Sequence, residues 1–249
     1  MQTVKAQTTG SALATAQLDE MYSLVLTQAS NPKAIEPTEL DETRRIVAAI
    51  LSTSTPLTLN SLAEVLQLSS EHLRGALEGL HAVIMVPENN EKGELRTLHA
   101  SFGDFIFSRA PEHIRISKSL GHDELARGCL GRMAAEDLCF NISRSTTSYM
   151  QNPEVGPEWI ASSLLYACLH WADHIKLASV KCSFDDEIDS VFRRKLLFWL
   201  EVLSIIGKVS RASSLILIAA SAVSPCAVYK LMVPNIKAGQ VSAGLPVSS

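Results

Sequence analysis

Residues 58–100 read TLNSLAEVLQLSSEHLRGALEGLHAVIMVPENNEKGELRTLHA, the clearest succession of structural signals in the chain. Apolar residues at helical spacing predict two short helices, the first capped by Asn60 or Ser61 and the second running from 70 to 81. A β-hairpin should follow, with strands at 82–86 and 95–100 around a turn at 89–93. A helix, a turn, a second helix and a hairpin are the later elements of a winged-helix domain, which needs one more helix before them.

The segment upstream supplies the missing helix. An apolar face beginning at about Asp41 predicts a helix that ends before Pro56. Three helices and a two-stranded wing make a winged-helix domain, which we place at residues 38–110. Before it we expect a disordered leader at 1–17 and an amphipathic helix at 18–31.

The rest of the chain is predicted to be helical. Three apolar stripes at helical spacing are Leu125, Cys129 and Met133; Leu164, Cys168, Trp171 and Ile175; and Ile188, Phe192, Trp199, Leu203 and Ile206. We expect a helical domain at 111–235 and a disordered tail at 236–249. The predicted fold class is mainly α, a winged-helix domain followed by an α-helical domain.

Composition narrows the choice of partners. The chain has 249 residues, 47% of them hydrophobic, so it can bury a sizeable core. Its 22 Lys and Arg stand against 26 Asp and Glu, and the longest basic run is Arg193–Lys195. Phosphate-directed binding needs a concentrated basic face, which this balance does not provide. We expect a protein partner and no nucleic acid.

Cysteine usage and hydropathy bear on location. Five scattered cysteines without a C-x-x-C pair are typical of free thiols in a reducing compartment, and no secretory signal begins the chain. We therefore expect a cytoplasmic protein. Residues 213–233 are strongly apolar, but Pro225 and Lys230 interrupt them, which favours a buried helix over a membrane span.

Known catalytic and metal-binding patterns fit poorly. His170 and His174 share a helical face, but no glutamate follows the first, and Cys168 and Asp173 lie off that face, so packing or surface histidines are favoured over a zinc site. The chain contains neither a G-x-S-x-G elbow nor a G-x-x-x-x-G-K-[ST] phosphate loop. We expect no catalytic residues, no metal site and no enzyme activity.

The winged helix raises the alternative of DNA binding. Its second helix, 70–81, would enter the major groove, yet it offers Glu71 and Glu78 against a single Arg74. Repulsion of phosphate would then oppose attraction. A protein-docking module is favoured, and a free-standing nucleic-acid-binding protein is the alternative.

The motif LHASFGDF (Leu98–Phe105) follows the hairpin. Ser101 and Asp104 fit a capping box at a helix start, while Phe102 and Phe105 should face the core. These roles leave His99 unexplained.

Several motifs in order carry a resemblance: LDEMYSLVL (18–26), the segment 43–86, LHASFGDFI (98–106), HDELARGCLGRM (122–133), LCFNI (138–142) and LLYACLHWADHI (164–175). The series is similar to the region after the ATPase core in basidiomycete fungal NACHT proteins, which are STAND ATPases related to NOD-like receptors. The resemblance covers residues 18–212. The chain lacks the phosphate-loop core, which suggests a truncated or misjoined product of a larger receptor gene.

The resemblance implies one site. In NACHT receptors the histidine of an H-x-[ST]-F-x-[DE]-F motif contacts the β-phosphate of ADP, and the matching residue is His99; the other matching positions are Ser101, Phe102, Asp104 and Phe105. An imidazole before a helix start can meet an anion that the helix dipole favours. ADP or ATP is expected only with an upstream ATPase core, the expected protein partner.

Gly103 departs from the family pattern, where a larger polar residue is usual. Taken together, the sequence predicts a non-catalytic regulatory fragment of a fungal NACHT signalling ATPase, whose winged helix senses ADP and holds the closed state. The alternatives are a free-standing nucleic-acid-binding winged helix and a membrane-anchored interaction module.

Overall fold

The computed structural model describes residues 3–29, 36–146, 156–179 and 184–222, and the side chains of residues 3–14 are not among those described. The described chain is mainly helical with one two-stranded sheet, which confirms the predicted mainly α class. The expected tail at 236–249 lies outside the described residues.

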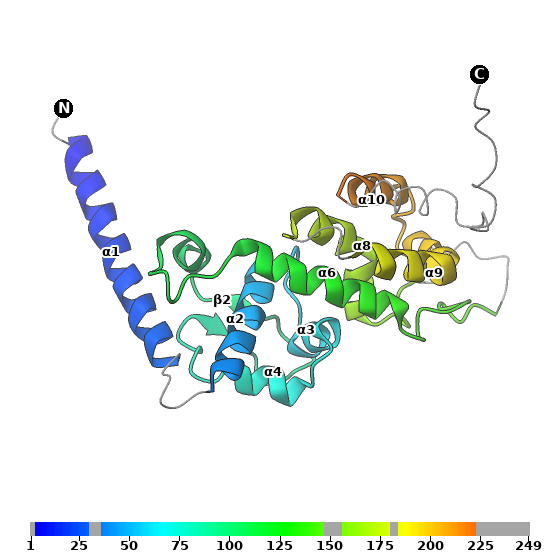
Figure 1. Cartoon of the computed structure of the whole chain (residues 1–249), viewed down its shortest axis with the longest axis horizontal. Helices are drawn as coiled ribbons and strands as arrows, with labels where there is room; N and C mark the ends of the chain where they lie inside the picture. The colour runs from blue at the N-terminus through cyan, green and yellow to red at the C-terminus, as the bar shows by residue number, and fades with distance from the viewer. Residues whose placement is uncertain (1–2, 30–35, 147–155, 180–183, 223–249) are drawn as a thin grey trace, which may run out of the picture.

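The first helix is longer than expected. Helix α1 spans Thr3–Ala29, so most of the segment 1–17, expected as a disordered leader, is helical. Only the C-terminal part of α1 meets the body of the molecule, and its N-terminal part runs away from it (Figure 1, blue). Tyr22 and Leu26 are the buried side chains of this C-terminal part.

Three helices and a hairpin follow in the predicted order. They are α2 (Pro37–Ser52), α3 (Leu59–Leu66), α4 (Ser70–Ala76), β1 (Ile84–Met85) and β2 (Arg96–Thr97). The strands are antiparallel, with Ile84 opposite Thr97. The expected caps Asn60 and Ser61 are wrong, because the hydroxyl of Thr58 accepts the Ser61 N–H at 3.2 Å.

Helix α4 is shorter than predicted. It ends at Ala76, and Gly79, with a positive φ of 83°, lies in the turn before the hairpin. Only glycine adopts that backbone conformation without a steric penalty. The remaining elements are α5 (Ser101–Asp104), the π-helical turn η1 (Phe105–Arg109), α6 (Lys118–Ala134), α8 (Ser162–Leu177), α9 (Asp185–Ile205) and α10 (Arg211–Ala220).

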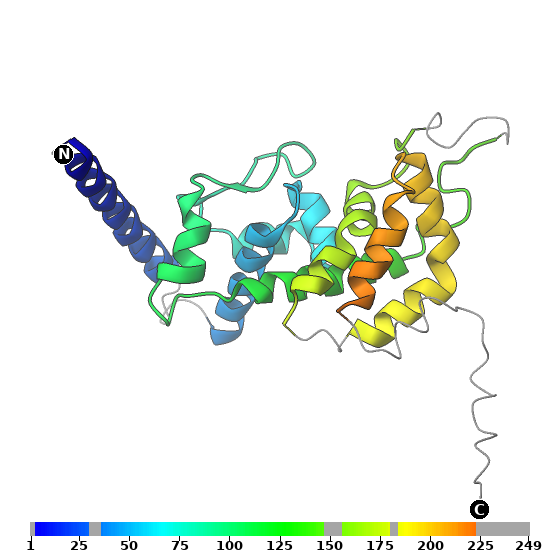
Figure 2. The ribbon, with the colours of Figure 1, turned by 90° about the horizontal axis from the view of Figure 1, so that it is seen from above.

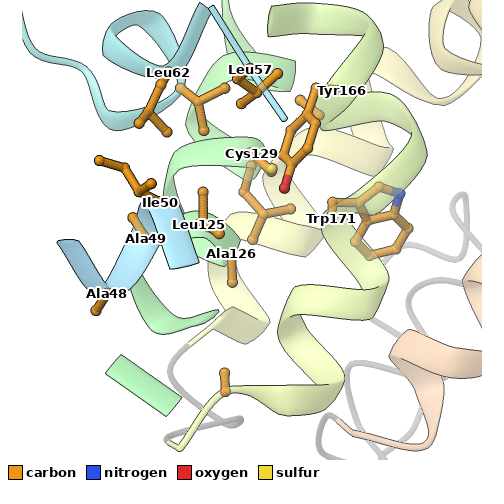
Figure 3. Close-up of a cluster of buried hydrophobic side chains, with 14 of the residues drawn as sticks. Ala48, Ala49, Ile50, Leu57, Leu62, Leu125, Ala126, Cys129, Tyr166 and Trp171 are labelled. Atoms are coloured by element: carbon orange, nitrogen blue, oxygen red, sulfur yellow. The ribbon is translucent and has the colours of Figure 1, made fainter. Parts of the chain in front are cut away.

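The expected domains at 38–110 and 111–235 share one core. Helix α6 runs along the molecule and packs against α2 and α3 as well as against α8 and α9 (Figure 1). Side chains from all these helices belong to a single buried cluster. Figure 3 shows Ala49 and Leu62 from the first part facing Leu125 of α6 and Tyr166 of α8.

Two glycines allow α6 to lie this close. Gly121 and Gly128 are two helical turns apart and therefore face the same way. A Cβ at Gly121 would collide with the Ala48 carbonyl, and a Cβ at Gly128 with the Val65 carbonyl. Glycine in a helix costs about 1 kcal/mol relative to alanine, which the close packing offsets.

The apolar segment at 213–233 is described only as far as residue 222. Helix α10 ends at Ala220, and residues from 223 onward lie outside the described part. Among the described helices, none combines the length and apolar character needed to cross a membrane.

We predict that Gly121→Ala lowers the free energy of unfolding by about 3 kcal/mol, since the methyl group would meet backbone atoms that cannot move aside. Urea denaturation measures the change. Gly75→Ala is the matched control: a Cβ on this exposed glycine of α4 meets nothing within 4 Å, so the variant should gain up to about 1 kcal/mol. Equal stability of the two variants would contradict the close crossing of α6.

Candidate functional site

His99 lies between β2 and α5, and its side chain is exposed. Its ring nitrogen Nδ1 accepts the backbone N–H of Ser101 at 3.1 Å and lies 2.7 Å from the Ser101 hydroxyl oxygen. The carbonyl of His99 accepts the N–H of Phe102 at 3.2 Å. The residue therefore fastens the start of α5 to the end of the hairpin.

The predicted capping box is wrong. The residue before α5 is Ala100, which makes no side-chain cap, and the Ser101 hydroxyl pairs with the His99 ring and with the hydroxyl of Tyr22, at 3.0 Å. The dipole of α5 can contribute little to binding an anion, because α5 has only 4 residues before the π-helical turn η1 begins. The imidazole of His99 does the capping that the sequence assigned to Ser101 and Asp104.

The hydrogen bonds of His99 determine which ring nitrogen carries the proton. A nitrogen that accepts a backbone N–H must present its lone pair, so the neutral ring carries its hydrogen on Nε2. Because Nδ1 points to Ser101, Nε2 is the ring nitrogen left for an external ligand. His99 can thus offer one N–H donor to an anion or a carbonyl.

The two phenylalanines of the motif are core residues, as predicted. Phe102 and Phe105 are buried, and both pack against the ring of Tyr22, with centroid separations of 5.3 and 5.4 Å. Arg109 of η1 holds α1 from the other side through two hydrogen bonds to Asp19, of 2.8 and 2.9 Å. These contacts place the C-terminal part of α1 directly beside the His99 motif.

A hollow of about 450 Å³ lies elsewhere, among α1, α2 and α4. Glu39, Glu42 and Glu78 line it, and Nε2 of His72 lies 2.9 Å from a carboxylate oxygen of Glu42. Carboxylates repel phosphate, so this hollow suits no nucleotide. His99 is not among its lining residues.

Of the two histidines considered for zinc, His170 packs against the ring of Tyr166, and His174 makes hydrogen bonds. His174 is buried and His170 is half-buried on α8. The described ranges contain no group of three or more His, Cys, Asp or Glu side chains placed to hold a metal ion. The partner of His174 is His122 of α6, with 3.0 Å between their Nδ1 atoms.

His174 belongs to a chain of buried hydrogen bonds. The hydroxyl of Tyr166 accepts the backbone N–H of Ser54 at 3.1 Å and lies 2.8 Å from Nε2 of His174. Since burial raises the pKa of Tyr166, the hydroxyl keeps its proton and can donate it to His174. His174 then donates from Nδ1 to His122, whose buried Nε2 has no hydrogen-bond partner among the described residues.

The roles of Tyr166 and His122 are not evident from the sequence. Both stand in quoted motifs, but neither belongs to the predicted apolar stripes of their helices. Their pairing depends on how α8 lies against α6.

The buried cysteines behave as the sequence predicts. Cys129 and Cys168 are free and buried, and burial raises the pKa of both thiols, so neither is activated as a nucleophile. Cys139 is free and exposed. Cys182 and Cys226 lie outside the described residues.

No protein-family model matches this sequence, and no curated protein or solved structure matches it either. The likeness to NACHT proteins therefore stays a prediction from the motifs. The structure adds to this prediction the hydrogen-bond geometry around His99.

We predict that acid destabilises the fold through the buried histidines. Burial, with smaller contributions from His122 and His170, lowers the pKa of His174 to about 3, whereas an unfolded histidine titrates near 6.5. The unfolded chain thus binds the proton first, and stability is lost as the pH falls below about 6.5. Between pH 7.5 and 5.0 the free energy of unfolding should drop by about 2 kcal/mol through His174 alone.

Urea denaturation at the two pH values measures this drop. His174→Gln should remove most of the pH dependence, while the same change at the exposed His81 should leave it intact. An unchanged pH dependence in His174→Gln would show that His174 is not held neutral by the fold.

Proposed function

We propose that the chain is a non-catalytic regulatory module of a NACHT-type STAND ATPase. In this proposal residues 37–110 form a winged-helix domain, and the helices from α6 onward form the helical region that follows it. The partner is an ATPase core, joined to this chain or carried by another subunit. His99 donates a hydrogen bond to the β-phosphate of ADP held by that core and so favours the closed state.

The order and packing of elements support the winged-helix assignment. Three helices, α2, α3 and α4, precede the β1–β2 hairpin, and the hairpin leads directly into the His99 motif. Apolar side chains from all three helices are buried together with those of the hairpin. This is the arrangement that a winged helix requires.

The observation that carries the functional proposal is that His99 is exposed while its Nδ1 is engaged by Ser101, which leaves Nε2–H as the donor for a ligand. The tautomer follows from the hydrogen bond that Ser101 gives to Nδ1. A neutral donor of this kind can bind a phosphate oxygen and can be withdrawn when the domain moves away. It binds no nucleotide by itself, because one hydrogen bond to a charged group contributes only about 1.5–3 kcal/mol.

The contacts of α4 argue against the DNA-binding alternative. The Arg74 guanidinium donates to the Pro87 carbonyl at 2.6 Å and also to the side chain of Asn90, so the arginine is folded onto the wing. Glu71 and Glu78 remain exposed near it. Reversing the charge at Arg74 would therefore damage the hairpin as well as any contact with DNA.

The membrane-anchored alternative rested on residues 213–233. Their described part belongs mostly to α10, which contacts α8 and α9 and adds Leu215 and Ala219 to the core. A helix that packs in this way is already partnered by protein. The regulatory module remains the function that the described contacts favour.

We predict that calorimetric titration of this chain with ADP or ATP shows no binding at micromolar concentrations. The reason is that His99 supplies a single donor and the hollow among α1, α2 and α4 is lined by carboxylates. A micromolar affinity for ADP that His99→Ala abolishes would show that the chain contains a whole nucleotide pocket, and the proposal would be wrong.

The protein isolated from its own cells provides the positive test. We expect it to be joined to or bound by a phosphate-loop ATPase that retains ADP, and His99→Ala should weaken ADP retention by about tenfold or more. The same change at the exposed His113 is the matched control. A single native product of about 27 kDa with no associated ATPase would contradict the proposal.

A further inference from the structure

Helix α1 is bound to the segment that carries His99 by three kinds of contact. The ring of Tyr22 packs edge-on against Phe102 and at a tilt against Phe105. The Tyr22 hydroxyl lies 3.0 Å from the Ser101 hydroxyl oxygen. Asp19 receives two hydrogen bonds from Arg109 of η1. All three contacts come from the last turns of α1.

The hydroxyl groups form a chain with a direction. Nδ1 of His99 presents a lone pair to Ser101, and the Ser101 hydroxyl at 2.7 Å can donate its proton to that lone pair. The Ser101 oxygen is then an acceptor for the buried Tyr22 hydroxyl, which needs such a partner. The sequence of donors runs from Tyr22 to Ser101 to His99, and it ends at the exposed Nε2–H.

We propose that α1 controls the orientation of His99, with Tyr22 as the positioning residue. When α1 is docked, Tyr22 supports Ser101 and the packing of Phe102 and Phe105, and His99 keeps its proton on Nε2. When α1 leaves, α5 loses both the hydroxyl contact and its aromatic packing, and the imidazole is no longer fixed. The regulatory meaning of this control rests on the proposed function of His99, whereas the contacts themselves do not.

The projecting N-terminal part of α1 is where an external force or partner could move the helix. Its N-terminal part runs clear of the described body, while its last turns carry the contacts with α5 and η1 (Figures 1 and 2). A movement imposed on the projecting part is therefore transmitted to Asp19 and Tyr22. Coupling of this kind is reciprocal, so a phosphate bound at Nε2 also favours the docked position of α1.

The test uses the whole chain, without nucleotide. Nitrogen NMR of the His99 ring reports its tautomer, and hydrogen exchange reports the protection of the amides of residues 101–105. In the unaltered chain we expect the Nε2–H tautomer. Tyr22→Phe removes only a hydroxyl and Asp19→Asn only a charge, yet both should give a tautomer mixture and about fivefold faster exchange in α5.

Matched variants separate positioning from general damage. Glu20→Gln changes the exposed neighbour on α1, and Tyr166→Phe removes the other hydroxyl that pairs with a histidine; both should leave the His99 signals unchanged. Ser101→Ala should reproduce Tyr22→Phe, and Ser101→Thr, which keeps a hydroxyl, should restore the tautomer. If Tyr22→Phe does not fold, Asp19→Asn provides the test, because that substitution leaves the ring of Tyr22 in place.

The inference is overturned if both Tyr22→Phe and Asp19→Asn leave the tautomer and the exchange of α5 as they are in the unaltered chain. This failure is distinct from failure of the proposed function. Unchanged ADP retention in His99→Ala would contradict the proposed phosphate contact but not the control by α1. Unchanged NMR signals in the α1 variants would contradict the control by α1 but not the phosphate contact.

Discussion

The arrangement of the molecule depends on the close approach of α6 to the backbones of α2 and α3. Gly121 and Gly128 meet the carbonyl groups of Ala48 and Val65 at distances that no side chain allows. Because α6 lies this deep, its opposite face can receive α8 and α9, and all these helices contribute to one core. The interior is densely packed, so this crossing also determines which polar groups of α6 and α8 meet.

Two chains of hydrogen bonds in the described residues differ in how they end. The buried chain links Ser54, Tyr166, His174 and His122 and ends at a nitrogen without a partner among the described residues. The second chain links Tyr22, Ser101 and His99 and ends at the surface. Each contains a tyrosine hydroxyl and a histidine whose tautomer follows from its hydrogen bonds: Tyr166 donates to His174, and Ser101 donates its N–H to His99. The first makes the fold sensitive to acid, and the second presents a donor to a ligand.

The proposed function uses the surface end of the second chain. A phosphate sensor needs a donor that is fixed in direction but contributes too little to hold the nucleotide alone, and His99 beside Ser101 meets both conditions. The acidic hollow among α1, α2 and α4 and the engaged Arg74 make anion binding elsewhere on this half of the chain less favourable. The role assigned to His99 therefore depends on local chemistry together with the motif resemblance.

The sequence by itself determined the mainly α class, the helix and hairpin order of residues 37–97, and the burial of Phe102, Phe105, Cys129 and Cys168. These properties follow from local periodicity, which records which face of an element is apolar. The long α1 was missed because residues 1–17 lack an apolar stripe, and the capping box was misassigned because Ser101 bonds to groups distant in sequence. Only the tertiary structure decided that His99 caps α5, that Tyr22 supports it, and that His122 meets His174. Periodicity shows that a residue is buried but not which residue lies against it, and hydrogen-bond partners and tautomers depend on that second fact.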